Sequence, residues 1–273
     1  MCATCGCGED GRSRITDLDT GRVETVHDHH DEGHGHGHGH GPGHHHHDGH
    51  THEHRPPTRI VTLEQDVLAK NDLLAARNRD WLATRGIVAL NLMSSPGAGK
   101  TTLLERTIRD LGAEVPVSVI EGDQETVLDA ERIRATGCRV VQINTGSGCH
   151  LDADMLGRGL ATLDPPADSL VMIENVGNLV CPALFDLGER TRVVIMSVTE
   201  GDDKPLKYPH MFRSARLMVV NKVDLAPHVD FDVDRCAGNA RRINPDLGVL
   251  TLSATRGDGL DAWYAWLRGH LTP

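Results

Sequence analysis

Residues 94–102 read SSPGAGKTT, and this stretch decides the fold. It overlaps the end of an apolar run, IVALNLMSS at residues 87–95, and leads into a helix-like segment, LLERTIRDLG at residues 103–112. A buried strand, a glycine-rich turn and a helix N-terminus in that order form a site for phosphate groups, because the helix dipole and the N–H groups of the turn both favour anions. The stretch therefore predicts a nucleotide-binding domain.

Each residue of this loop has a role in that prediction. Gly97 and Gly99 let backbone N–H groups approach phosphate oxygens without a Cβ in the way. Lys100 supplies a positive charge to the β- and γ-phosphates, and Thr101 a hydroxyl for Mg²⁺. The loop departs from the usual pattern at Ser94, where a glycine is more common. The predicted phosphate-binding residues are Gly97, Ala98, Gly99, Lys100, Thr101 and Thr102.

After Gly86, apolar segments of strand length alternate with helix-length segments. Strands that are apolar on both faces and alternate with helices form a mostly parallel sheet with helices on both sides. Ligands of such α/β folds bind beyond the carboxyl ends of the strands, which is where the polar motifs fall. The predicted strands are residues 87–95, 115–123, 139–146, 169–176, 191–199, 216–224 and 247–254.

The chain divides into two parts. Residues 1–57 are rich in Gly, His and Asp and poor in aliphatic residues, so we expect a disordered metal-binding segment unless metal organises it. Residues 58–273 form the nucleotide-binding domain. This part opens with an amphipathic helix at residues 62–85, for which Thr62 is the expected N-cap and Gly86 the stop. The residues expected to face the domain are Leu63, Val67, Leu74, Trp81 and Leu82.

Composition excludes several classes of protein. The net charge of −11 over 273 residues argues against a nucleic-acid partner. No apolar stretch approaches the roughly 20 residues that span a bilayer, and the N-terminus lacks a signal peptide. Seven cysteines, an odd number with three in the first seven residues, do not form a disulfide framework. We therefore expect a soluble, reduced, cytoplasmic protein.

A second motif predicts which base the domain binds. Residues 221–224 read NKVD, and Ser253 to Thr255 follow the next predicted strand with SAT. The Asp224 carboxylate can accept from both N1–H and the exocyclic amino group of guanine, which adenine cannot offer. Asn221 can bond the other edge of the base and connect this loop to the phosphate loop. The pattern favours GTP over ATP, with Asn221, Lys222, Asp224, Ser253 and Ala254 as the base site.

Two acids end predicted strands that face the phosphates. Asp123 lies in EGDQET and Glu174 in ENVGN. Either can hold Mg²⁺, directly or through water, or orient the attacking water, and the sequence leaves that choice open. Solvated acids at strand ends are the simpler alternative. The predicted catalytic residues are Lys100, Asp123 and Glu174, and the predicted Mg²⁺ ligands are Thr101, Asp123 and Glu174.

Cysteines form two candidate metal sites. Cys2, Cys5 and Cys7 have C-x2-C-x-C spacing near the chain start, which suits Ni²⁺ or Cu²⁺ as well as zinc; the alternative is a reactive tail without metal.

In the domain, Cys149, His150 and Cys181 lie in loops on the γ-phosphate side. Three ligands leave the site incomplete, so two chains meeting there could complete it, which suggests a nucleotide-dependent homodimer. Burial of Cys149 and Cys181 in the core is the alternative. The remaining cysteines, Cys138 and Cys236, are expected in the core, and His210, His228 and His270 at the surface.

The histidines are concentrated in one tract. Of the 18 histidines, 14 lie between His27 and His54, inside the chain and in mixed spacing, unlike a purification tag. Neutral imidazoles bind metal, and many together hold several ions without one shaped site. We expect a nickel reservoir at His34, His36, His38, His40, His44, His45, His46 and His47.

Together these motifs closely resemble the HypB family of hydrogenase nickel-incorporation GTPases. The resemblance rests on MCATCGC, the His-rich stretch, SSPGAGKTT, EGDQET, NTGSGCHLD, ENVGNLVCP and NKVDL, and it covers essentially the whole chain. It implies a P-loop NTPase fold of the SIMIBI class, which dimerises with nucleotide between subunits. It also implies nickel delivery to the large subunit of [NiFe]-hydrogenase, with the zinc-containing partner HypA and the chaperone SlyD as partners. The family's metal ligands correspond to both cysteine sites above, and Lys204 and Lys207 lie in a family-like segment, with Lys204 expected near the nucleotide.

Three functions stay open at this point. The first is a GTP-switched nickel metallochaperone. The second is an accessory GTPase for urease or another metalloenzyme, although urease proteins carry Cys-Pro-His where this chain has Cys181-Pro182-Ala183. The third is metal storage with incidental GTPase activity. Zn²⁺ is an alternative ion for the domain site.

Overall fold

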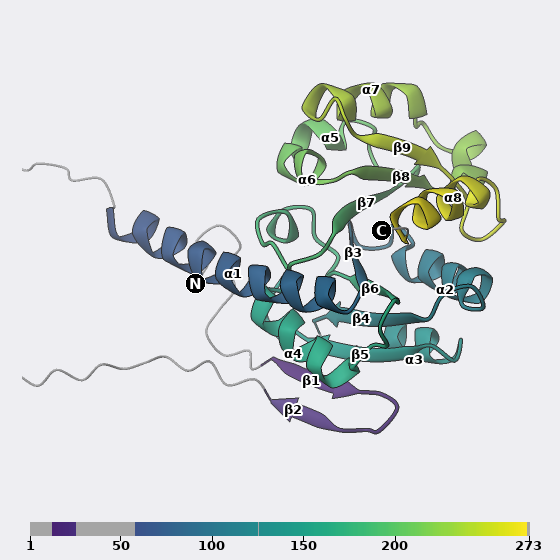
Figure 1. Cartoon of the computed structure of the whole chain (residues 1–273). Coiled ribbons are helices and arrows are strands. Elements are labelled where there is room, and N and C mark those ends of the chain that lie inside the picture. Colours follow the sequence, from purple (N-terminus) through teal and green to yellow (C-terminus); the bar gives the residue numbers. More distant parts are fainter. Residues whose placement is uncertain (1–12, 26–57, 125, 272–273) are drawn as a thin grey trace, which may run out of the picture.

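A computed structural model describes residues 13–25, 58–124 and 126–271, with only the helical backbone described for residues 58–64. A nine-stranded sheet forms the centre of the molecule, in the order β2-β1-β5-β4-β6-β3-β7-β8-β9 (Figure 1). From β5 to β9 all neighbouring strands are parallel, which confirms the predicted α/β sheet. The seven predicted strands are β3 Val88–Ser94, β4 Val117–Asp123, β5 Arg139–Asn144, β6 Leu170–Glu174, β7 Thr191–Ser197, β8 Leu217–Asn221 and β9 Gly248–Thr251.

Helices cover both faces of the sheet because its central parallel strands, such as β3, β6 and β8, are buried on both sides. One face packs against α2 (Lys100–Leu111), α3 (Leu128–Arg134) and α8 (Leu260–Leu271). The opposite face packs against α1 (Thr58–Thr84), α4 (Ala153–Leu163), α6 (Pro209–Ser214) and α7 (Val233–Ile243). Shorter elements complete the chain: η1 Cys181–Ala183, α5 Lys204–Lys207 and η2 Val223–His228.

Two short strands extend the sheet beyond the predicted seven. β1 (Arg14–Asp17) pairs antiparallel with both β2 (Val23–Thr25) and β5, and Arg14 lies opposite Asn144. Ile15 is fully buried between the sheet and α4. The expectation of disorder throughout residues 1–57 is therefore wrong for residues 13–25. One apolar residue on a four-residue strand gives no usable periodicity, so the sequence held little signal for it.

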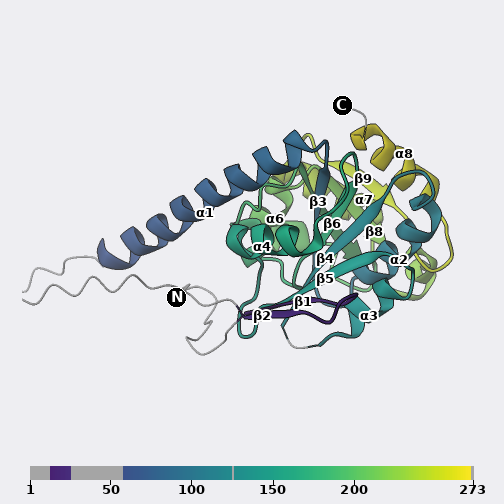
Figure 2. The same cartoon turned by 60° about the horizontal axis from the view of Figure 1, so that its bottom comes forward.

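Helix α1 starts earlier and packs differently than predicted. It begins at Thr58, so Thr62 is inside the helix and is not its N-cap; Gly86, with φ of 65°, follows its end as expected. The buried face includes two asparagines, Asn71 and Asn78, with Ala75 and Leu82, whereas Val67 is exposed. The N-terminal turns of α1 project beyond the body of the domain (Figure 2). The predicted apolar face is thus only partly correct, because the helix contacts loops through polar groups.

The sequence predicts no membrane-spanning segment, and the structure allows this to be checked for helices. Within the part of the chain that the structure describes, no helix is both long and apolar enough to cross a bilayer.

Candidate functional site

The phosphate loop connects β3 to α2 in the conformation that the glycines allow. Gly97 and Gly99 have φ values of 73° and 95°, in the left-handed region that favours glycine. A Cβ on Gly99 would lie 2.5 Å from Nδ2 of Asn221, so this position also lacks space for a side chain. Lys100 Nζ donates to Ser94 Oγ at 2.8 Å, so the serine in place of the usual glycine contacts the lysine that is predicted to bind phosphate.

A cavity of about 490 Å³ opens in front of this loop. It brings together residues from β3–α2, from the ends of β4 and β6, and from α3. The predicted residues that line it are Gly97, Gly99, Lys100, Thr101, Thr102, Asp123, Glu174 and Lys222. The cavity therefore joins the predicted phosphate loop to the predicted acids.

Glu174 is fixed beside the loop. Thr101 Oγ1 donates to Glu174 Oε1 at 2.8 Å, while Glu174 Oε2 is buried and has no hydrogen-bond partner among the described residues. Burial raises the pKa of Glu174 to about 7, and the charge of Lys100 opposes that shift. Asp123 is half-buried at the end of β4 and accepts from the N–H and the hydroxyl of Thr126, at 2.9 and 2.8 Å.

Glu121 is a third acid of the cavity, and sequence reasoning missed it. It lies opposite Glu174 in the β4–β6 register, and its Oε2 is buried without a partner in the described structure. Burial, with the nearby charges of Glu174 and Asp123, raises the pKa of Glu121 to about 9. Residues two apart on a strand share a face, so its spacing from Asp123 was the available signal.

These acids and Thr101 fit a hard divalent cation. Two buried carboxylate oxygens, of Glu121 and Glu174, have no partner in the described part of the chain, and both pKa values are raised, so a cation coordinated by carboxylate oxygens would satisfy both groups.

The base-binding loop is connected to the phosphate loop as predicted for Asn221. Its Nδ2 donates to the Ala98 carbonyl at 3.0 Å, and its Oδ1 accepts from the N–H of Ala254 at 3.1 Å. Lys222 donates from Nζ to the Gly97 carbonyl at 2.7 Å. Asp224 Oδ1 is buried without a partner among the described residues, which leaves an acceptor for a ligand.

The two lysines of the GDDKPLKYP segment differ. Lys204 Nζ lies 2.8 Å from Glu200 Oε2 and donates to Ser95 Oγ at 2.9 Å, so it contacts the phosphate loop but does not line the cavity. Lys207 pairs with Asp203 at 2.7 Å at the surface.

The structure brings the three predicted ligands of the domain metal site together. The ligand atoms of Cys149, His150 and Cys181 all lie within 4.8 Å of one another. The two sulfurs are 2.9 Å apart, well beyond the about 2.05 Å of a disulfide, and Cys149 Sγ is 3.6 Å from His150 Nδ1. Burial lowers the pKa of His150 to about 4, so the ring is neutral at pH 7 and offers a lone pair to metal. Its ring stacks on Phe185, with centroids 4.0 Å apart.

The remaining predicted cysteines and histidines are distributed as follows. Cys138 and Cys236 are buried, as expected, and burial raises the pKa of each thiol to about 12. His210 and His228 are exposed, whereas His270 is half-buried against Trp266. Cys2, Cys5, Cys7 and the histidines of the tract lie outside the described residues, so their metal binding stays a prediction.

Comparison with known proteins assigns the family. Residues 88–251 match the family described as CobW/HypB/UreG, nucleotide-binding domain. The hydrogenase maturation factor HypB of Rhizobium leguminosarum bv. viciae is 59% identical over 209 residues, which cover 77% of this chain and 70% of that protein. The chain belongs to the HypB family of hydrogenase maturation factors.

Two solved structures of HypB share the fold. The crystal structure of HypB from Archaeoglobus fulgidus is 46% identical and covers 75% of this chain and all of that one, with a TM-score of 0.70. HypB from Helicobacter pylori in complex with nickel is 36% identical over 74% of this chain and 95% of that one, also with a TM-score of 0.70. The predicted P-loop NTPase fold is confirmed.

Proposed function

We propose that this HypB-family chain hydrolyses GTP and uses hydrolysis to deliver Ni²⁺ for the maturation of [NiFe]-hydrogenase. The observation that carries the proposal is the cluster of Cys149, His150 and Cys181, on loops that follow β5 and β6. β6 ends in Glu174 of the nucleotide cavity, so the two sites share a strand end. The Helicobacter pylori HypB structure in complex with nickel supports nickel as the cargo.

In this proposal the cavity residues have different roles in nucleotide binding and hydrolysis. Lys100 binds the β- and γ-phosphates, and the unpartnered Asp224 oxygen accepts from guanine. Thr101, Glu174 and Glu121 would hold Mg²⁺, which neutralises charge that develops on the phosphates. Asp123, which lines the same cavity at the end of β4, orients the attacking water.

The metal cluster supplies three ligands, and a second copy of the chain would supply the rest. Val180 and Leu184, one residue before and three residues after Cys181, are 42% and 43% exposed, so the segment that carries this ligand has apolar side chains at the surface. Nickel and zinc both accept thiolate and imidazole ligands, so Zn²⁺ is the competing ion. In this view Cys2, Cys5, Cys7 and the His tract collect nickel, and the partners are an accessory protein of the HypA type, SlyD and the hydrogenase large subunit.

The test measures Ni²⁺ affinity and oligomeric state of the full chain with GDP and with a non-hydrolysable GTP analogue. We expect different affinities in the two states and loss of the difference in Cys181→Ser. Cys236→Ser is the matched control, because that thiol is buried away from the cluster. Equal affinity and an unchanged oligomeric state in the unsubstituted protein contradict the coupling.

A role in urease maturation has its own test. Loss of urease with intact hydrogenase on deletion of the gene would favour the urease alternative over hydrogenase maturation. Ala183 after Cys181-Pro182, where urease proteins carry histidine, argues against that outcome.

A further inference from the structure

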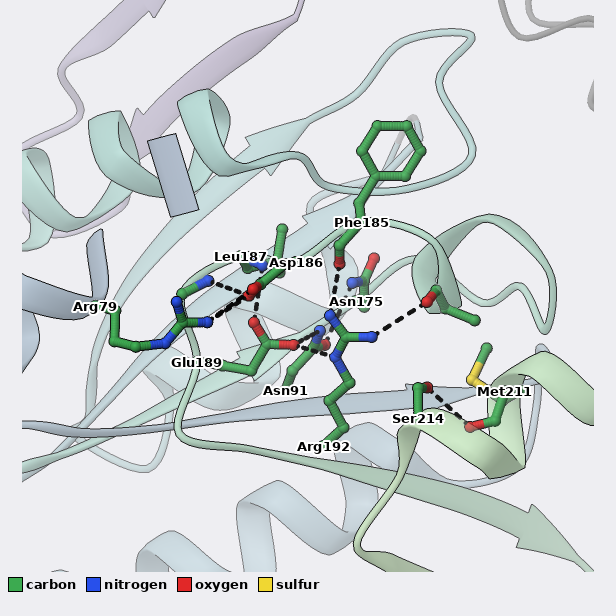
Figure 3. A network of polar contacts seen from close by, with 12 residues as sticks. Arg79, Asn91, Asn175, Phe185, Asp186, Leu187, Glu189, Arg192, Met211 and Ser214 are labelled. Atoms are coloured by element: carbon green, nitrogen blue, oxygen red, sulfur yellow. Dashed lines mark hydrogen bonds and ion pairs between the residues drawn. The ribbon is translucent and has the colours of Figure 1, made fainter. Parts of the chain in front are cut away.

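A polar network includes Asn175, Asn91, Glu189 and Arg192 (Figure 3). It extends from a residue that lines the nucleotide cavity toward both loops of the metal cluster. Its central residue is Asn175, which directly follows Glu174 and is 1% exposed. Asn175 Oδ1 accepts from the N–H of Leu151, the residue after His150, at 3.2 Å. Asn175 Nδ2 donates to Asn91 Oδ1 on β3, also at 3.2 Å. One side chain thus reaches the first ligand loop and the strand that leads into the phosphate loop.

The second ligand loop is held by the continuation of this network. Asn91 Nδ2 donates to Glu189 Oε1 at 3.2 Å, and Arg192 Nε donates to the same oxygen at 2.5 Å. The Arg192 guanidinium then donates to the carbonyls of Ala183 and Phe185, each at 3.1 Å. These carbonyls lie two and four residues after the second cysteine of the cluster, so the network fixes the segment that carries it.

The segment that contains Asn175 also lines the nucleotide cavity. Residues 174–177 line the cavity, and a Cβ on Gly177 would lie 3.1 Å from the backbone of Pro96 in the phosphate loop. A nucleotide bound in this cavity would therefore adjoin a segment in which Asn175 is hydrogen-bonded toward both ligand loops.

Because these hydrogen bonds are buried, breaking any one of them is costly. Asn91, Asn175 and Glu189 are all nearly inaccessible to water, so a broken bond leaves a polar group without a replacement partner. A shift of residues 174–177 is accommodated at lower cost when the ligand loops move with it.

We propose that Asn175 is the positioning residue that couples the nucleotide state to the geometry of Cys149, His150 and Cys181. This inference rests on the proposed function, because it requires metal affinity to depend on the nucleotide. Asn175 acts on the first ligand loop through the N–H of Leu151. It acts on the second through the side chains of Asn91, Glu189 and Arg192, and it supplies no ligand itself.

The experiment uses the full chain with Cys2, Cys5 and Cys7 each replaced by Ser. Thiolate-to-nickel absorption then reports the domain cluster, because the His tract contains no thiol and the thiols of Cys138 and Cys236 are buried. Ni²⁺ is titrated with GDP and with a non-hydrolysable GTP analogue, and the measured quantity is the ratio of the two apparent dissociation constants. Competition by the His tract affects both titrations equally and cancels in the ratio.

We expect a ratio of about 5-fold or more in the unsubstituted network and less than about 2-fold in Asn175→Ala, since couplings between sites typically span about 5- to 150-fold. Asn91→Ala is the second variant and should also lower the ratio, because it removes the connection to Glu189. The matched control is Asn244→Ala. Asn244 likewise donates to backbone carbonyls, those of Phe212 and Ala215, but it belongs to neither of the hydrogen-bonded connections to the ligand loops. It should leave the ratio unchanged.

The outcomes separate the two proposals. A ratio near one in the unsubstituted network refutes the coupling in the proposed function, and this inference with it. A large ratio that survives in Asn175→Ala or, should that variant not fold, in Asn91→Ala refutes only the role of Asn175. An equal decrease in Asn244→Ala shows general destabilisation and also refutes it.

Discussion

Replacing Glu121 by Gln should stabilise the nucleotide-free protein at neutral pH. Burial and the charges of Glu174 and Asp123 raise the pKa of Glu121 from 4.5 to about 9. The unfolded chain ionises this group above about pH 4.5, whereas the folded chain keeps the proton until about pH 9. Between these values the unfolded state binds fewer protons than the folded state, so stability falls as the pH rises.

The structure sets the size of this effect. At pH 7 the solution is 2.5 units above the ordinary pKa of 4.5, and at about 1.4 kcal/mol per unit the cost is about 3 kcal/mol at most. Gln has the shape of protonated Glu, and its amide does not ionise in this pH range. Glu121→Gln should therefore raise the free energy of unfolding by about 1–3 kcal/mol at pH 7 and by little at pH 5.

Urea denaturation of the full chain at pH 5, 6 and 7, followed by tryptophan fluorescence, measures this difference. Glu131→Gln is the matched control, because Glu131 is exposed on α3, and it should show no comparable rise. Glu121→Gln should also weaken binding of Mg²⁺–GTP, since the cavity loses one carboxylate. A stability difference that does not grow between pH 5 and pH 7, or a destabilised variant at pH 7, would refute the reasoning.

Three further predictions concern the base site, the sheet edge and α1. Asp224→Asn should lower GTP affinity about 10- to 100-fold, because a charge-assisted pair of hydrogen bonds is lost. It should improve binding of xanthosine triphosphate, which has a carbonyl in place of the amino group; competition between the two nucleotides measures the change, and unchanged selectivity contradicts the base site. Ile15→Ala should cost about 2–4 kcal/mol of unfolding free energy in urea titrations if β1 is part of the core, as full burial indicates. Asn78→Ala should cost about 1–3 kcal/mol, because the buried carbonyls of Ala153 and Leu187 lose their donor, and a neutral result would show that water replaces it.

The parallel part of the sheet could be predicted because its signal is local. Each strand from β3 to β9 is a short apolar run between polar segments, and the phosphate loop identifies which strand comes first. The same holds for the cluster of Cys149, His150 and Cys181, since the carboxyl ends of all the parallel strands lie at one edge of the sheet.

The structural features that the sequence did not predict, β1 and the polar buried face of α1, depend on partners distant in the sequence. Ile15 is a strand residue only because β5 offers an open edge, and Asn71 and Asn78 face inward only because loop carbonyls 75 or more residues away accept their hydrogen bonds. Nothing near these residues in the sequence indicates those acceptors.

The antiparallel pairing of β1 with β5 has a consequence for the first cysteine motif. Arg14 lies opposite the last residue of β5, and that strand leads within five residues to Cys149. Six residues lie between Cys7 and Arg14, and the seven Cα–Cα steps from one to the other span at most about 25 Å. Because β1 joins this cysteine motif to the domain in one chain, an encounter between its thiols and the domain cluster would be intramolecular, and its rate would not depend on protein concentration.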